Sequence, residues 1–167
     1  MTEMEKNGNI NADKPHSGAA EVREEYIMLR TAREFMRACD ASGLKYKDDR
    51  ELDSGKYLVV CGVNGSSGNS YDVMFLFDQD EESVGLRVYG LAKCNRDSYA
   101  KALLKVNALN DRFRWFKFVI DKDNDINMEM DAVITPRTAG DVCTELLRRC
   151  MSVAKDAYPE LMRVLWG

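Results

Sequence analysis

The sequence has almost no histidine, since His16 is the only one among 167 residues. It lies in a polar N-terminal stretch, which leaves the predicted domain without a histidine for a hydrolytic triad or a zinc site. The motifs HExxH and GxSxG are also missing, and acidic pairs such as Glu81 and Glu82 are typical of solvated turns. The sequence therefore predicts no catalytic residues, no cofactor and no metal site, and we expect a protein that is not an enzyme.

Paired cysteines are lacking as well. The cysteine count is odd, no CxxC motif occurs, and the residues are spread singly: Cys39, Cys61, Cys94, Cys143 and Cys150. Two of them share a predicted helix seven residues apart, which is about 10 Å along its axis and too far for a disulfide. Small buried thiols in a reducing compartment are the simple explanation. A redox-active or nucleophilic cysteine is the alternative.

Long apolar runs and an excess of positive charge are absent too. No run of roughly 18 apolar residues occurs, and the first residues contain no apolar segment of the signal-peptide type. We therefore expect a cytoplasmic protein without membrane contact. A net charge of −4 gives no general electrostatic support for binding phosphate backbones, so no nucleic-acid partner is expected.

The chain divides by composition into a tail and a domain. Residues 1–20 are rich in Asn, Gly, Lys and Glu and contain few large apolar side chains, which predicts a disordered N-terminal tail. Residues 21–167 are predicted to form a single domain. A domain of this size buries close to 70% of its unfolded surface, which is enough for a core of its own.

The first half of the domain is predicted to be one helix and a strand meander. Apolar residues recur at three- and four-residue steps over 21–41, which predicts a helix that Ser42 and Gly43 end. Three strands follow, at 57–63, 70–78 and 83–92, and a short edge strand near 45–47 is an option. The expected pairs in the second hairpin are Phe77–Val84, Phe75–Leu86 and Val73–Val88.

The second half is predicted to be helix, hairpin, helix. A helix capped by Asn95 or Asp97 runs to about residue 110, strands occupy 112–120 and 126–134, and a last helix begins after Thr135–Thr138. Pro159 should stop or kink that helix near Tyr158 and leave 160–166 as a terminal turn. The order α-β-β-β-α-β-β-α predicts an α+β fold, an antiparallel sheet of about five strands with helices packed on one face.

The hairpin has two distinct faces. A polar loop over 121–125 sets the register, which places the following pairs on an apolar face: Ile120–Ile126, Phe118–Met128, Phe116–Met130 and Arg114–Ala132. The other face pairs Val119–Asn127, the oppositely charged Lys117–Glu129, and Trp115–Asp131. The loop resembles the start of a calcium-binding loop, but its sixth position is Ile126 and its twelfth is Ala132. A polar hairpin turn is therefore the favoured interpretation.

The most informative predicted surface is the second face of the sheet. It carries more apolar side chains than a solvated face usually does. The candidate protein-binding residues are Met74, Leu76, Tyr89, Trp115 and Val119. Three explanations stay open, because a partner or second copy could cover them, a loop of the same chain could, or they could be exposed singly.

Four stretches together resemble the YbjN family, whose fold is similar to that of the type III secretion chaperones. They are the strand 71–77, the helix end Leu103-Leu104-Lys105-Val106-Asn107-Ala108-Leu109-Asn110, the hairpin with its acidic turn, and the helix ending Ala157-Tyr158-Pro159. The helix end looks like the family's Leu/Val-Asn-x-Leu-Asn pattern. Asn107 and Asn110 match its asparagines, for which capping the helix and satisfying the turn is a sufficient role.

The resemblance, which covers about residues 21–158, implies a secretion-chaperone-like fold and a non-enzymatic, chaperone-like or regulatory domain of bacterial type. Families of this kind are often described as sensory transduction regulators, and secretion chaperones are commonly dimers that bind an extended client segment. We therefore expect a protein client or a second copy as partner. The alternative is a small-molecule-sensing regulatory domain with a pocket between sheet and helices.

Overall fold

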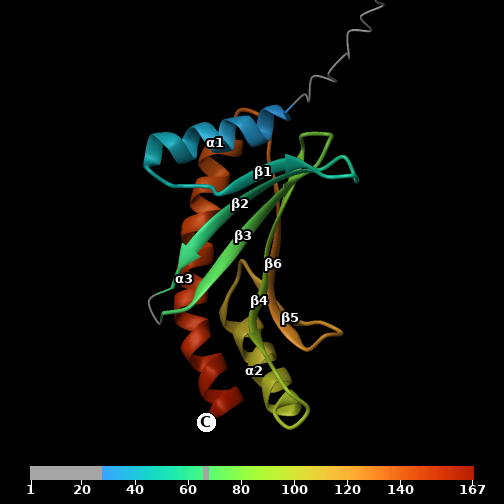
Figure 1. Cartoon of the computed structure of the whole chain (residues 1–167), viewed down its shortest axis with the longest axis vertical. Helices are drawn as coiled ribbons and strands as arrows, with labels where there is room; N and C mark the ends of the chain where they lie inside the picture. The colour runs from blue at the N-terminus through green and yellow to red at the C-terminus, as the bar shows by residue number, and fades with distance from the viewer. Residues whose placement is uncertain (1–27, 66–67) are drawn as a thin grey trace, which may run out of the picture.

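The computed structural model describes residues 28–65 and 68–167. Three helices and six strands follow one another along the chain (Figure 1): α1 Arg30–Ser42, β1 Asp48–Glu51, β2 Tyr57–Asn64, β3 Ser70–Phe77, β4 Ser83–Lys93, α2 Tyr99–Arg112, β5 Lys117–Ile120, β6 Asp125–Val133 and α3 Ala139–Trp166. The predicted disordered tail, with His16, and the predicted helical residues 21–27 lie outside the described residues.

The strands form one antiparallel sheet in the order β1-β2-β3-β4-β6-β5, so the predicted α+β class is confirmed. The sheet has six strands rather than about five, because the optional edge strand exists as β1, slightly later in the chain than 45–47. The predicted pairs Phe77–Val84 and Phe75–Leu86 are confirmed. So are four pairs of the hairpin: Ile120–Ile126, Val119–Asn127, Phe118–Met128 and Lys117–Glu129.

All three helices lie against one face of the sheet, which we call the first face. Figure 1 shows α3 running behind the strands, with α1 across one end and α2 near the other. Phe35 of α1 is fully buried, and its ring centroid lies 4.3 Å from that of Phe75 and 5.9 Å from that of Phe77. Burying such a side chain contributes roughly 1.5–3 kcal/mol, so this contact fixes α1 on the sheet.

The start of α1 is held by a distant carboxylate. The helix has no side-chain cap of its own, and Glu81 in the β3–β4 turn accepts hydrogen bonds from the Thr31 N–H at 2.9 Å and from the Arg30 Nε at 3.0 Å. Partial burial acts to raise the pKa of Glu81, but these hydrogen bonds outweigh it and hold the pKa below its usual value. The turn between two strands therefore acts as the N-cap of α1.

The prediction that Asn95 or Asp97 caps α2 is wrong. The residue before the helix is Ser98, and Asn95 instead accepts the Ser98 N–H at 2.8 Å in the preceding turn. The predicted strand start at Arg112 is also wrong, since α2 includes this residue and β5 begins only at Lys117. Local propensity misplaced both boundaries by a few residues, as is usual for element ends.

The predicted stop of α3 near Tyr158 is wrong as well, because the helix continues through Pro159 to Trp166. Beyond the proline, Leu161 and Leu165 are buried in the core. Glu160 accepts hydrogen bonds from Arg112 at 2.6 Å and from Lys105 at 3.2 Å, both on α2, and these cations hold its pKa below the usual value. Tertiary packing therefore carries the helix across a residue that lacks a donor.

Candidate functional site

The second face of the sheet, turned away from the helices, is where the sequence predicts a binding surface. Met74 and Leu76 of β3 do lie on it, and both are half-buried. Their partners across the β2–β3 ladder are Val60 and Leu58, which are buried although they point away from the main core. This part of the face is an apolar strip sheltered within its own chain.

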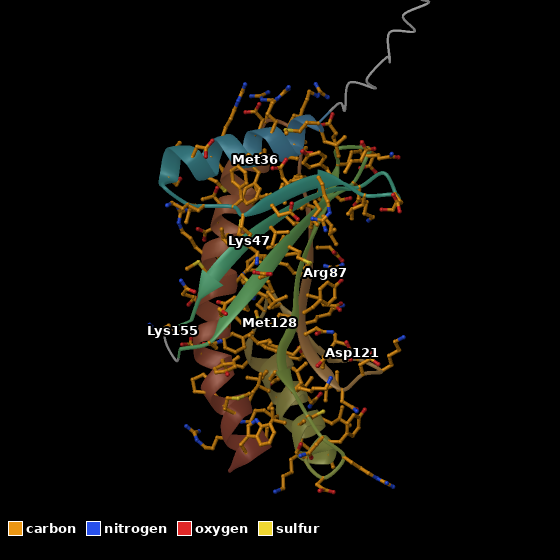
Figure 2. The ribbon with its side chains drawn as sticks, in the orientation of Figure 1. Met36, Lys47, Arg87, Asp121, Met128 and Lys155 are labelled. Carbon is orange, nitrogen blue, oxygen red and sulfur yellow. The ribbon has the colours of Figure 1, made fainter. Side chains whose placement is uncertain are left out.

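Ion pairs flank the strip. Lys47 donates to Asp72 at 2.7 Å, and Arg87, which pairs with Met74 in the β3–β4 ladder, donates to Asp131 at 2.7 Å (Figure 2). Arg87 also donates to the carbonyl oxygen of Met130 at 2.7 Å. Lys47 and Arg87 are therefore both occupied by partners in the same sheet.

Tyr89 and Val119 lie at the other end of the second face and are exposed, by 53% and 36%. Both lie near Asn127, which pairs with Val119 and accepts the N–H of Gly90 at 2.8 Å in a bulge of β4. Gly90 has φ 62°, a conformation that favours glycine, so the bulge is built into the sequence.

Trp115 does not lie on the second face, and this part of the prediction is wrong. The alternation of β5 begins only at Lys117, so it does not extend to Trp115. The indole instead lies against α3, where the guanidinium of Arg149 is 5.1 Å from the ring centroid. The predicted pairs of Phe116 with Met130 and Arg114 with Ala132 are not formed either, since the β5–β6 ladder ends at Lys117–Glu129.

The edges of the sheet prove more informative than its second face. The β1 edge consists of Asp48-Asp49-Arg50-Glu51, and such a short charged strand discourages pairing with another chain. The β5 edge is closed by Asn110 of α2, whose side chain accepts the Phe118 N–H at 2.6 Å and donates to the Phe118 carbonyl at 3.0 Å. Asn110 thus takes the place of a neighbouring strand.

The upper part of β6 is an open edge. β5 covers β6 only from Ile126 to Glu129, and within the described chain no other strand pairs with its outer side from Met130 to Val133. The Ile134 N–H donates to the Glu82 carbonyl, and this bond lies next to the Ser83–Val133 pair. Because hydrogen-bonded and non-hydrogen-bonded pairs alternate in an antiparallel ladder, Val133 does not bond to β4. By alternation, Asp131 and Val133 direct their backbone N–H and C=O groups outward, away from β4.

A groove runs beside this open edge, and we call it the β6 groove. Its volume is about 680 Å³, and one wall is β6 while the other is α3. Trp115 is 49% exposed in it and Val133 86%. Its lining residues are Arg114, Trp115, Met130, Asp131, Ala132, Val133, Asp141, Val142, Glu145, Leu146 and Arg149. An apolar groove beside unpaired backbone groups has the two components of a strand-binding site.

The acidic stretch Asp121–Asp125 forms a hairpin turn, as predicted (Figure 2 shows Asp121 on the β5–β6 hairpin). Asp121 accepts the N–H groups of Asp123 and Asp125 at 2.9 and 3.0 Å and the Asn127 amide at 3.0 Å, and this last bond chiefly lowers its pKa. Lys93 pairs with Asp125 at 2.9 Å. The carboxylates bind their own chain, and no group of potential metal ligands occurs in the described ranges.

All five cysteines are buried and free, which confirms the prediction of buried thiols. Burial raises the pKa of the Cys143 and Cys150 thiols to about 12, so both are protonated at neutral pH. A protonated, inaccessible thiol is a poor nucleophile.

Sequence reasoning missed the β6 groove for a traceable reason. Alternating apolar residues over 112–120 indicated a long first strand of the hairpin, which would have covered the edge of β6. In the structure Phe113 packs on Phe118, with ring centroids 6.1 Å apart, at the end of α2. The one available signal was Asn110, which the family pattern includes and which holds β5 beside the helix end.

Comparison with known proteins supports one family. A family model described as "Putative bacterial sensory transduction regulator", the YbjN model, matches residues 34–163. A solved structure, "Crystal structure of YbjN, a putative transcription regulator from E. coli", is similar in fold with a TM-score of 0.53 and 10% sequence identity, and the match covers 77% of this chain and 92% of that one. No curated protein matches the sequence.

Proposed function

The chain belongs to the YbjN family, and we propose that it is a non-enzymatic regulatory domain of the cytoplasm that binds a polypeptide along the open edge of β6. The bound segment lies extended in the β6 groove and pairs with the outward backbone groups of Asp131 and Val133. Side chains on its inner side contact Trp115 and the apolar residues of α3. The chaperone-like behaviour expected from the sequence is thereby assigned to one edge of the sheet.

The observation that carries this proposal is the contrast between the three edges. Exposed strand edges are liable to pair with other chains, and natural sheets close them with charge, with short strands or with covering elements. Here β1 is short and charged and β5 is closed by Asn110, whereas β6 keeps its edge open over four residues next to an apolar groove. Selective retention of one open edge is the arrangement expected of a strand-addition site.

No helix in the described part of the chain is long and apolar enough to cross a bilayer. The alternative function, small-molecule sensing, has one observation in its favour, since 680 Å³ lies within the range of about 300–1,000 Å³ typical of ligand pockets. A thermal-shift screen of common metabolites tests it. A discrete ligand whose effect disappears in Trp115→Ala favours sensing, and no shift across the screen counts against it.

Site-specific photocrosslinking tests the polypeptide-binding proposal. A photoreactive amino acid replaces Val133 in one variant and Asp49, on the charged β1 edge, in a matched control. Each purified protein is irradiated in lysate of the source organism. We expect adducts with defined polypeptides at position 133 and none at position 49, and adducts at both positions or at neither would overturn the assignment to β6.

A further inference from the structure

A second cavity lies between the sheet and α3, apart from the β6 groove, and we call it the α3 pocket. Its volume is about 390 Å³, and its walls are the end of the β2–β3 hairpin and the second half of α3. Figure 1 shows this end of the hairpin next to α3, away from α1 and from the β5–β6 hairpin. The largest side chains that line it are those of Tyr71, Met151, Lys155 and Tyr158.

Two local patterns bring these side chains together. Tyr71 pairs with Val63 across the β2–β3 ladder, and both pack on the first face, where the helices lie. Met151, Lys155 and Tyr158 follow one another at steps of four and three residues, so they form one stripe of α3 beside its buried stripe. At this end of the sheet, the first face and α3 therefore enclose a cavity in place of a filled core.

Lys155 supplies a positive charge that the described chain does not neutralise. It is the one charged side chain among the described lining residues, and Figure 2 shows it on α3 beside the end of the β2–β3 hairpin. The ion pairs described for α3 involve Arg149 and Glu160, and Lys155 takes part in none of them. The sequence explains this, because positions 151, 152, 158 and 159, which neighbour Lys155 on the helix surface, carry no acid.

The rest of the wall is aromatic, with one hydroxyl that keeps its proton. Tyr71 and Tyr158 are both half-buried, and Met151 is 37% exposed beside them. Burial raises the pKa of Tyr71 to about 12, and the neighbouring Cys150 thiol adds to the shift, so this phenol stays a hydrogen-bond donor at neutral pH. Aromatic rings and a thioether favour a flat apolar ligand, and the phenol and the ammonium group favour an acceptor on it.

We propose that the α3 pocket binds a small aromatic carboxylate, whose ring lies against Tyr71 and Tyr158 and whose carboxylate accepts a hydrogen bond from Lys155. The size fits, because ligand pockets typically measure about 300–1,000 Å³ and this one lies near the small end. A phosphorylated ligand fits less well, since phosphate sites favour arginine forks or a helix N-terminus. The described lining has a single lysine, and α3 begins about 24 Å away along its axis.

This inference goes beyond the proposed function and does not rest on it. The β6 groove is lined by α3 residues up to Arg149, whereas the α3 pocket is lined by residues from Met151 onward and by a different hairpin. A ligand could therefore bind here whether or not a polypeptide binds at β6.

Calorimetric titration of the full chain with three probes of nearly the same shape tests the charge preference. The probes are indole-3-acetate, the uncharged indole-3-acetamide and the cationic tryptamine, and benzoate and 4-hydroxyphenylacetate extend the series of carboxylates. We expect saturable binding of one carboxylate per chain and at least about tenfold weaker binding of the amide, because a charge-assisted hydrogen bond is about twice as strong as a neutral one. Tryptamine should not bind, since its ammonium group would face Lys155.

Substitutions locate the binding site. Lys155→Met keeps the length of the side chain and removes its charge, so the affinity for the carboxylates should fall at least about tenfold. Lys155→Arg keeps the charge and should retain binding. Lys101→Met, at an exposed lysine of α2, is the matched control, and Trp115→Ala alters only the β6 groove. Both of these variants should bind like the wild type.

Three results would overturn the inference. They are no binding of any carboxylate at millimolar concentration, equal affinity for indole-3-acetate and its amide, and wild-type affinity in K155M. Loss of binding in W115A but not in K155M would place the ligand in the β6 groove, which also overturns the α3 pocket. None of these results changes the adducts expected at position 133, so failure of this inference and failure of the proposed function are distinguishable.

Discussion

Asn110→Ala is the most direct test of how the β5 edge is closed. The substitution removes both hydrogen bonds that the side chain makes with the backbone of Phe118, at 2.6 and 3.0 Å. The N–H and C=O groups of Phe118 point to the outer edge, since its neighbours Lys117 and Val119 are the residues that bond to β6. Phe118 is buried, and among the described residues Asn110 is the side chain that bonds to these groups.

The expected loss follows from typical hydrogen-bond values. Each bond contributes a net 0.5–1.5 kcal/mol, and an unsatisfied, partly buried backbone group adds a desolvation penalty. Alanine returns about 0.5 kcal/mol through its higher helix propensity. The free energy of unfolding should therefore fall by roughly 1–3 kcal/mol, which lowers the melting temperature by about 3–10 °C for a domain of this size.

Urea unfolding followed by circular dichroism measures this loss, and hydrogen exchange at the Phe118 amide locates it. Asn107→Ala is the matched control, because Asn107 lies on the same helix, is exposed, and makes no side-chain hydrogen bond to the described residues. The control should be neutral or slightly stabilising. If N110A and N107A unfold at the same urea concentration, the edge-closing role of Asn110 is wrong.

Three further outcomes are expected. Pro159→Ala should raise the free energy of unfolding by about 1–3 kcal/mol, because the helix already continues through this position and regains a backbone hydrogen bond; a thermal melt no higher than wild type would contradict this. Hydrogen bonds from Lys56, Thr31 and Arg112 hold the pKa values of three carboxyl groups, Asp78, Glu81 and Glu160, below their unfolded values. These carboxylates should therefore stabilise the fold fully above about pH 4.5, and this stabilisation should be lost as the pH falls further. Comparing the urea midpoints at pH 7 and pH 3 measures the loss. All five buried thiols should resist a disulfide reagent until the chain unfolds, and fast reaction of one thiol in native protein would contradict their structural role.

The parts of the fold that follow from periodicity were predictable. Alternation fixed the pairs Phe75–Leu86 and Phe118–Met128, because a one-residue shift would have turned an apolar set to solvent. Helical stripes likewise located all three helices. Periodicity relates residues two to four positions apart in the sequence, and it therefore succeeds where one face of an element is buried.

Errors arose where distant contacts decide the outcome. α3 passes Pro159 because Leu161 and Leu165 are buried beyond it and because Glu160 pairs with Lys105 and Arg112 of α2. None of these contacts can be predicted from the local sequence. Trp115 fits the alternation of a strand. It nevertheless lies against Arg149, because after α2 ends at Phe113 the chain runs toward α3 and not along the edge of β6. The prediction of the candidate site was affected most, since it assumed that β5 began before Trp115.

The same displacement of β5 links the fold to the proposed site. If β5 began at Arg112, it would cover β6 along its whole length and leave no open edge. Asn110 instead fixes Phe118 beside the end of α2, and the residues between them turn toward α3 and place Trp115 in the β6 groove. Asn110 thus closes the edge of β5, while the residues that follow it leave the edge of β6 free from Met130 to Val133. A variant that lengthened β5 toward Trp115 should close the groove, and it should abolish binding at Val133 without reducing stability.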